Sequence, residues 1–120
     1  DVLVLAVAGT PETVQLIGAA ELEAMKRDAC LINVARGIVV DETALAEGLA
    51  AGRIAGAALD VFVREPLPTD SPLWGLPNVL ITPHVAVNTP SKMHRAIEHF
   101  ADNLTRYCAG QPLRDLVHRP

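Results

Sequence analysis

Hydrophobic and polar residues follow one another along the chain in blocks that predict strands separated by helices. Four short apolar runs predict strands over residues 2–7, 30–34, 55–61 and 79–82. The first run is apolar throughout, which predicts a strand buried on both faces of a parallel sheet. Helical signals fill the intervals between the runs. This alternation predicts an α/β fold with a parallel sheet and right-handed crossovers.

The interval after the first strand carries a helix-start signal. Thr10 is predicted as the N-cap, and Pro11 stands at the first helical position, where proline is well tolerated. A short helix through Leu16 is expected from this start. A second helix is expected over residues 20–25.

A further helix is predicted to begin after Asp41, whose side chain can accept hydrogen bonds from the first free amides. Its apolar positions Leu45, Leu49 and Ala50 are expected to share one buried face. Gly52 is expected to end this helix, because glycine suits the left-handed conformation found at helix C-termini.

A proline-rich loop and a long helix follow the third strand. Residues 66–77 form a loop by composition, with Trp74 expected to pack onto the body of the domain. The long helix is expected from residues 89–90 to about residue 108. Its apolar positions keep helical spacing: Met93, Ile97, Phe100, Ala101, Leu104 and Cys108.

Composition narrows the function classes. The chain has 120 residues, half of them apolar, and a net charge of −4 without a basic stripe, so the charge pattern of nucleic-acid binding is missing. Cys30 and Cys108 do not suggest a disulfide framework, which favours a reducing, cytoplasmic setting. No apolar run is long enough to span a bilayer. The chain has no initiator Met and starts on a strand, so we expect a piece of a longer protein.

Three polar residues follow predicted strands within a few positions. Arg36, Glu65 and His84 follow the second, third and fourth apolar runs. Ligands of open parallel sheets bind at the carboxyl ends of the strands, so these side chains are expected to converge on one rim. A guanidinium suits a carboxylate, an imidazole suits proton transfer, and a carboxylate can orient the imidazole. Taken singly, each could also be an ordinary solvated loop residue.

Other polar residues give weaker indications of function. Asp60 ends an apolar run and could cap loop amides. His94, Glu98 and His99 share the last helix, but the two histidines are five positions apart, so no metal site is expected. Arg64 stands beside Glu65 and could compete with His84 for its carboxylate.

Short motifs in a fixed order carry a resemblance to a known family. They are residues 10–13 (TPET), 31–37 (LINVARG), 40–42 (VDE), 57–62 (AALDVF), 65–66 (EP), 73–74 (LW) and 78–84 (NVLITPH). Each is weak alone, but their order and spacing are specific. Over nearly its whole length the chain resembles the cofactor-binding domain of the D-isomer-specific 2-hydroxyacid dehydrogenases.

The resemblance implies the second half of a Rossmann-like doubly wound sheet over residues 1–88. Residues 89–120 would be a crossover helix and tail returning to a substrate domain. The resemblance also implies catalytic roles for Arg36, Glu65 and His84. For Asp60 it implies contact with the nicotinamide, and we consider this role and the capping of loop amides equally open. The implied contacts to NAD or NADP are Val7, Ala8, Gly9, Thr13, Val34, Ala35, Arg36, Asp60, His84 and Ala86.

Two function hypotheses follow. The first is an NAD(P)-dependent oxidoreductase of a small 2-hydroxy or 2-oxo acid, a homodimer when complete. The family's Gly-rich phosphate loop is expected before Asp1, since no GxGxxG motif occurs in the chain. The second is a non-catalytic cofactor-binding or assembly module, such as a corepressor-like relative or a truncated product.

Overall fold

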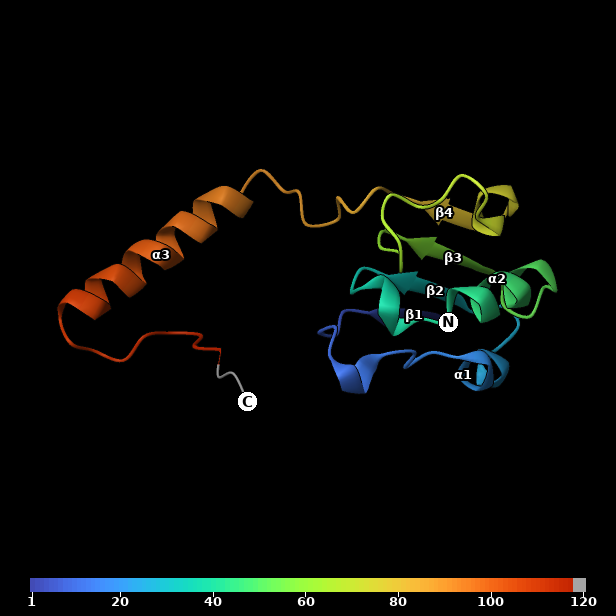
Figure 1. The fold of residues 1–120 in the computed structure, drawn as a ribbon, viewed down its shortest axis with the longest axis horizontal. Coiled ribbons are helices and arrows are strands. Elements are labelled where there is room, and N and C mark those ends of the chain that lie inside the picture. Colours follow the sequence, from blue (N-terminus) through green and yellow to red (C-terminus); the bar gives the residue numbers. More distant parts are fainter. Residues whose placement is uncertain (118–120) are drawn as a thin grey trace. The chain divides into compact units, whose positions relative to one another are not determined.

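The computed structural model describes residues 1–117, and the chain divides into two compact units, Asp1–Ala86 and Val87–Pro120. The first unit is built on four strands, β1 (Val2–Leu5), β2 (Cys30–Asn33), β3 (Gly56–Leu59) and β4 (Val79–Ile81). They form one parallel sheet in the order β1-β2-β3-β4 (Figure 1). The predicted α/β fold with a parallel sheet is confirmed, with strands shorter than the apolar runs.

The first predicted helix is wrong beyond its first turn. Only a 3₁₀ turn, Pro11–Thr13, forms there, and the next α-helix is α1 (Ala19–Ala24). The chain leaves helical geometry because the Gln15 backbone N–H donates to the Ile38 carbonyl, at 2.7 Å. That bond ties the segment to the Gly37–Val39 turn and prevents the helix from continuing.

The helix after Asp41 is α2 (Glu42–Ala50), and its predicted cap is confirmed, because the Asp41 carboxylate accepts hydrogen bonds from the first-turn amides. Leu45 and Leu49 are buried as predicted, but Ala50 is exposed. Ala50 lies about 100° around the helix from Leu49, which turns it out of the buried face. Ala46 is buried in its place.

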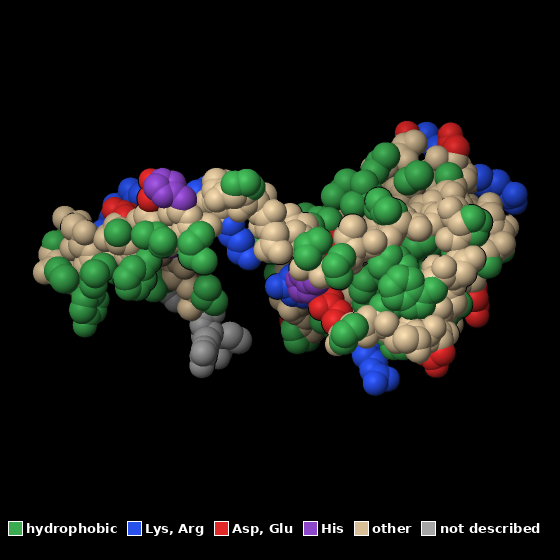
Figure 2. Space-filling view, turned by 90° about the horizontal axis from the view of Figure 1, so that it is seen from above, with side chains coloured by type: hydrophobic (Ala, Val, Ile, Leu, Met, Phe, Trp, Pro, Cys, Tyr) green, Lys and Arg blue, Asp and Glu red, His purple; other side chains and the backbone are tan. Residues whose placement is uncertain are grey.

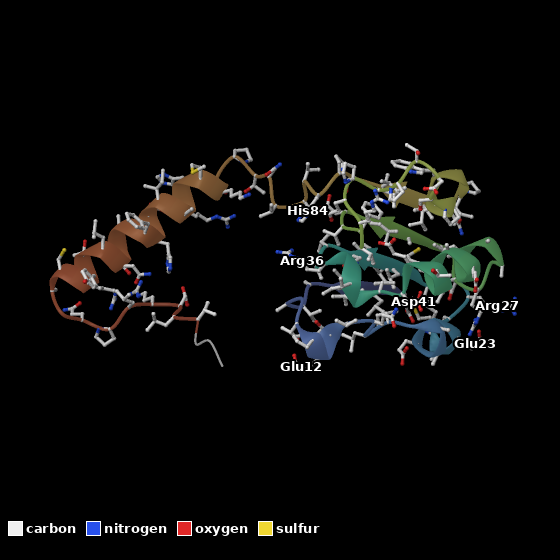
Figure 3. All side chains as sticks on the ribbon, viewed as in Figure 1. Glu12, Glu23, Arg27, Arg36, Asp41 and His84 are labelled. Carbon is white, nitrogen blue, oxygen red and sulfur yellow. The ribbon has the colours of Figure 1, made fainter. Side chains whose placement is uncertain are left out.

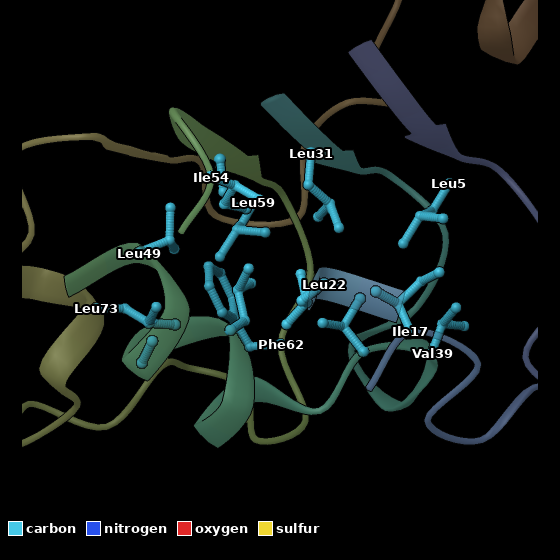
Figure 4. Close-up of a cluster of buried hydrophobic side chains, with 14 of the residues drawn as sticks. Leu5, Ile17, Leu22, Leu31, Val39, Leu49, Ile54, Leu59, Phe62 and Leu73 are labelled. Carbon is cyan, nitrogen blue, oxygen red and sulfur yellow. The ribbon is translucent and has the colours of Figure 1, made fainter. Parts of the chain in front are cut away.

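The core lies on one face of the sheet. Leu5, Leu31 and Leu59 point from the strands into a cluster with Leu22 of α1 and Leu49 of α2 (Figure 4). Both helices cover this face because the strands follow one another in sheet order and every crossover has the same hand.

The opposite face of the sheet is open in this unit. Val4, Ile32, Ala58 and Leu80 lie in register across the four strands, and Val4 and Leu80 are more than half exposed. The expectation of a first strand buried on both faces is therefore wrong. The alternate residues of that strand, such as Leu5, are the buried ones.

The loop before β4 is anchored by a different residue from the one predicted. Leu73, in the 3₁₀ turn Pro72–Gly75, is buried, whereas Trp74 is half exposed. The Trp74 indole N–H donates instead to the Pro68 carbonyl at 2.8 Å, so the tryptophan closes the loop on itself.

The second unit contains α3 (Lys92–Cys108), close to the predicted long helix. Its apolar side chains gather along one face and are exposed within this unit (Figure 2): Met93, Ile97, Phe100, Leu104 and Tyr107. The end of the predicted tail, residues 118–120, lies outside the described residues. Among the described helices, none combines the length and apolarity needed to cross a membrane.

Candidate active site

The three predicted strand-end residues lie at one edge of the sheet. Arg36 follows β2, Glu65 lies in the loop after β3, and His84 follows β4; Figure 3 labels Arg36 and His84 at this edge. All three line one cavity of about 320 Å³, together with Gly9 from the loop after β1. The structure thus brings the three side chains together, as predicted from their places after the strands of a parallel sheet.

His84 and Glu65 form a hydrogen-bonded pair. The His84 Nδ1 lies 2.8 Å from Glu65 Oε2, and Glu65 Oε1 accepts from the Phe62 backbone N–H at 3.0 Å. The bond with His84 is the main cause that lowers the pKa of the Glu65 carboxyl, followed by the Phe62 amide. An ionised carboxylate only accepts, so the hydrogen sits on Nδ1 and His84 Nε2 is left for a ligand.

Arg64 does not take part in this pair. Among the described contacts of the Glu65 carboxylate, none involves the Arg64 guanidinium. The hypothesis that Arg64 competes with His84 for Glu65 is therefore not supported. The cation that acts on Glu65 from a distance is Arg36, which contributes to the lowered pKa of Glu65.

A buried asparagine shapes the turn that carries Arg36. Asn33 is 1% exposed, its Oδ1 accepts from the Ala35 backbone N–H at 3.0 Å, and its Nδ2 donates to the Arg36 carbonyl at 3.1 Å. The Arg36 side chain runs along the loop after β1, where a Cβ on Gly9 would stand 2.9 Å from Arg36 Cγ. Within residues 1–117 the Arg36 guanidinium forms no ion pair, so it is available to an anionic ligand.

Asp60 organises the loop that carries His84. Its Oδ1 accepts from the Thr82 hydroxyl and from the Val85 backbone N–H, and its Oδ2 accepts from the Ala86 backbone N–H at 2.9 Å. The His84 backbone N–H donates to the Asp60 carbonyl at 2.8 Å. Burial alone raises the pKa of the Asp60 carboxyl, but these hydrogen bonds outweigh it and the net pKa is lowered.

This network explains how His84 keeps an unusual backbone. His84 has φ +54°, in the left-handed region that non-glycine residues rarely adopt. Amides on both sides of it are fixed to Asp60, so the surrounding hydrogen bonds hold the strained conformation. The loop-capping role of Asp60 is thus observed, while its contact with a nicotinamide stays a prediction.

The predicted cofactor contacts lie in the strand-end loops. Val7, Ala8, Gly9 and Val34 are exposed, and Ala86 belongs to the His84 loop. Two of the predicted residues are engaged in local structure: Ala35 is buried beneath the Arg36 turn, and the Thr13 hydroxyl donates to the Ala8 carbonyl at 2.8 Å. Thr13 therefore fixes the loop after β1.

A second cavity of about 270 Å³ lies against the same pair. Glu65 and His84 line it together with apolar residues that include Phe62, Leu67 and Trp74. The His84–Glu65 pair therefore has an open cavity shared with Arg36 and a more apolar one beside it. No group of three metal-ligating side chains occurs in the described part of the chain.

Three contributing residues received no role from the sequence: Asn33, Thr82 and Glu42. A polar residue closing an apolar run was the available signal for Asn33 and Thr82. No such signal exists in the sequence for Glu42. An acidic residue in the first turn of a helix is already explained by its favourable interaction with the helix dipole. The contact of Glu42 with the loop after β3 is visible only in three dimensions.

Comparison with known proteins identifies the family. The family described as D-isomer specific 2-hydroxyacid dehydrogenase, NAD binding domain, matches residues 1–86. The chain belongs to this family. It is similar to glyoxylate/hydroxypyruvate reductase B of Pectobacterium carotovorum, with 46% identity over 98% of this chain and 37% of the relative. It is also similar to D-3-phosphoglycerate dehydrogenase of Archaeoglobus fulgidus, with 41% identity over 100% of this chain and 23% of the relative.

Solved structures of the family have the same fold. A 2-hydroxyacid dehydrogenase from Xanthobacter autotrophicus, in complex with NADPH and MES, matches with a TM-score of 0.89 and 45% identity, over 98% of this chain and 48% of that one. D-lactate dehydrogenase with NAD⁺ from Lactobacillus jensenii matches with a TM-score of 0.86 and 33% identity, over 99% and 40%. The chain thus spans well under half the length of these curated relatives and less than half of these solved chains.

Proposed function

We propose that the full-length protein is an NAD(P)-dependent oxidoreductase that interconverts a small 2-hydroxy acid and its 2-oxo acid. The observation that carries this proposal is the cavity whose wall combines the Arg36 guanidinium with the His84–Glu65 pair. The names of similar proteins, which include glyoxylate reductase and glyoxylate/hydroxypyruvate reductase, make glyoxylate and hydroxypyruvate the first substrates to test.

His84 is the proton-transfer residue in this proposal. Oxidation of a hydroxy acid removes a hydride from carbon and a proton from oxygen, and His84 Nε2 accepts that proton. In the reverse direction the same nitrogen donates a proton to the carbonyl oxygen. Glu65 holds Nδ1, which orients the ring and places a negative charge beside it.

Arg36 is the substrate-binding residue. Its planar guanidinium can bind a carboxylate through two parallel hydrogen bonds, which fixes the acid in one orientation. The same group, close to the reacting oxygen, favours negative charge developing there during reduction. Both roles need a guanidinium without a carboxylate partner of its own, as the described residues show for Arg36.

The strand-end loops fit the nicotinamide end of NAD or NADP. Val7 and Val34 present apolar surface, at 40% and 41% exposed, that suits a flat ring. Asp60 Oδ2 accepts only one described hydrogen bond, so it retains capacity for a carboxamide N–H. When bound, the cofactor supplies the hydride for reduction and takes it up in oxidation. Ala8, Gly9 and Ala86 complete the proposed wall, and Thr13 and Ala35 belong to it by supporting the loops that form it.

We also propose the domain organisation and the oligomeric state of the full-length protein from its membership of the family. Residues 1–88 are part of the dinucleotide-binding domain, and residues 89–120 return toward a substrate domain. The apolar stripe of α3, exposed within its own unit, supports a packing role for that helix. We also propose that the full-length protein is a cytoplasmic homodimer.

The test is an assay of the full-length protein with NADH and with NADPH against glyoxylate, hydroxypyruvate and larger 2-oxo acids. Oxidation of the cofactor that depends on the oxo acid is expected, and His84→Ala should abolish it. A wild-type protein that binds cofactor but turns over none of these acids would favour the non-catalytic module instead.

A further inference from the structure

The segment between β3 and Glu65 is held in place by a hydrogen bond to a residue of another element. Its Phe62 amide donates to Glu65, and the next amide, of Val63, donates to Glu42 Oε1 at 2.5 Å. Glu42 is the first residue of α2, 21 positions away in sequence. The Phe62–Val63 peptide, which directly follows the peptide whose N–H supports Glu65, is therefore tied to the start of a helix packed in the core.

The Phe62–Val63 peptide is also held from a second direction. A Cβ on Gly37 would stand 1.9 Å from the Phe62 carbonyl carbon and 2.2 Å from the Val63 nitrogen. The backbone of Gly37 thus presses against the Phe62–Val63 peptide with no side chain between them. Gly37 limits the position of this peptide by contact, and Glu42 adds a directional bond.

Glu42 is well suited to this task by its place in the helix. The Asp41 side chain already caps the first-turn amides, so the Glu42 carboxylate is not needed there. A carboxylate at the start of a helix also interacts favourably with the partial positive charge of the helix N-terminus. Hydrogen bonds to an ionised acceptor are about twice as strong as those between neutral groups.

We infer that Glu42 is a positioning residue for the proposed reaction: it fixes the Phe62–Val63 peptide, and through Phe62 it fixes the adjoining N–H that holds Glu65 on His84. Glu42 itself does not line the cavity that holds Arg36, Glu65 and His84, so it acts through Glu65. The inference rests on the proposed function for its kinetic consequences. Its structural part, a loop fixed by one carboxylate, is independent of any activity.

The kinetic test uses the full-length protein with Glu42→Ala, Glu42→Gln and the control Glu47→Ala. Glu47 is an exposed acid on the same helix without a described side-chain hydrogen bond. Glu42→Ala is expected to lower kcat about tenfold with little change in the KM for the oxo acid. Glu42→Gln keeps an acceptor oxygen and is expected to retain most of the activity, and Glu47→Ala all of it.

A double variant separates positioning from general destabilisation. If Glu42 acts through Glu65, Glu42→Ala should have no further effect on kcat in a Glu65→Gln background. Additive losses, or a Glu42→Ala variant as active as Glu47→Ala, would overturn the inference.

Hydrogen–deuterium exchange provides a readout without turnover. In the peptide covering residues 61–66, Glu42→Ala is expected to speed exchange at least tenfold, while Glu47→Ala leaves it unchanged. Equal protection in both variants would overturn the inference even if the wild-type protein proved inactive. Faster exchange in Glu42→Ala with an inactive wild type would uphold the positioning role and refute the proposed function alone.

Discussion

At the scale of single residues, Glu65 is the side chain whose charge matters most for the site. Its lowered pKa keeps the carboxylate ionised below its ordinary value of 4.5, so the pair with His84 persists into acid. Since His84 Nδ1 has no other described acceptor, the ring orientation depends on this one contact.

Glu65→Gln in the full-length protein is expected to lower kcat about 100-fold, within the range of acid–base contributions. The amide carries no negative charge beside the ring, and it can present N–H rather than oxygen to Nδ1. The measurement is the steady-state pH profile of kcat/KM. Arg64→Ala serves as control, and its profile should match wild type. A shifted profile in Arg64→Ala would restore the competition hypothesis.

Gly37 is a second residue whose substitution has a clear expected effect on stability. Because its missing Cβ would overlap the Phe62–Val63 peptide, Gly37→Ala should force the loop after β3 away from the turn. We expect a loss of at least about 2 kcal/mol in the free energy of unfolding, measured by urea denaturation of the full-length protein. Gly75→Ala, where nothing lies within 4 Å, is the matched control and should cost little.

At the scale of elements, the loop after β4 is a unit built around one buried carboxylate. Asp60→Asn replaces one acceptor oxygen with an N–H₂ group, and either orientation of the amide sets a donor against a donor of the loop. We expect a lower thermal midpoint and at least a tenfold lower kcat, because His84 loses its fixed backbone. A variant with wild-type kcat would show that the loop holds His84 without Asp60.

Asp60 also predicts a pH dependence of stability. Its folded-state pKa lies below its ordinary value of 3.8, so its stabilisation is complete above that value. The stabilisation is lost as pH falls through the lowered folded-state pKa. Acid unfolding of wild type should therefore be steeper in this range than that of Asp60→Asn. Identical slopes for the two proteins would argue against this contribution.

The elements also show which parts of the fold the sequence was sufficient to predict. The cap at Asp41, the stop at Gly52 and the parallel sheet follow from local chemistry and alternation, and the structure confirms them. The helix through Leu16 was wrong because a backbone bond from Gln15 to Ile38 competes with it. Convergence of Arg36, Glu65 and His84 followed from topology, whereas the role of Glu42 depends on a contact 21 residues distant.

At the scale of the whole molecule, the unpaired surfaces of the first unit decide how this chain behaves alone. β1 is an edge strand, and the open sheet face carries the in-register row Val4, Ile32, Ala58 and Leu80. Exposed apolar faces and unpaired strand edges both promote association.

The 120-residue chain produced by itself is therefore expected to self-associate, seen as a mass above that of the monomer in sedimentation or light scattering. Val4→Lys with Leu80→Lys places two charges on the open face and should shift the population toward monomer. Val14→Lys with Leu16→Lys changes two exposed apolar residues outside the sheet and should not. A monomeric wild-type chain, or an equal response to both pairs, would show that the open face is not what drives association.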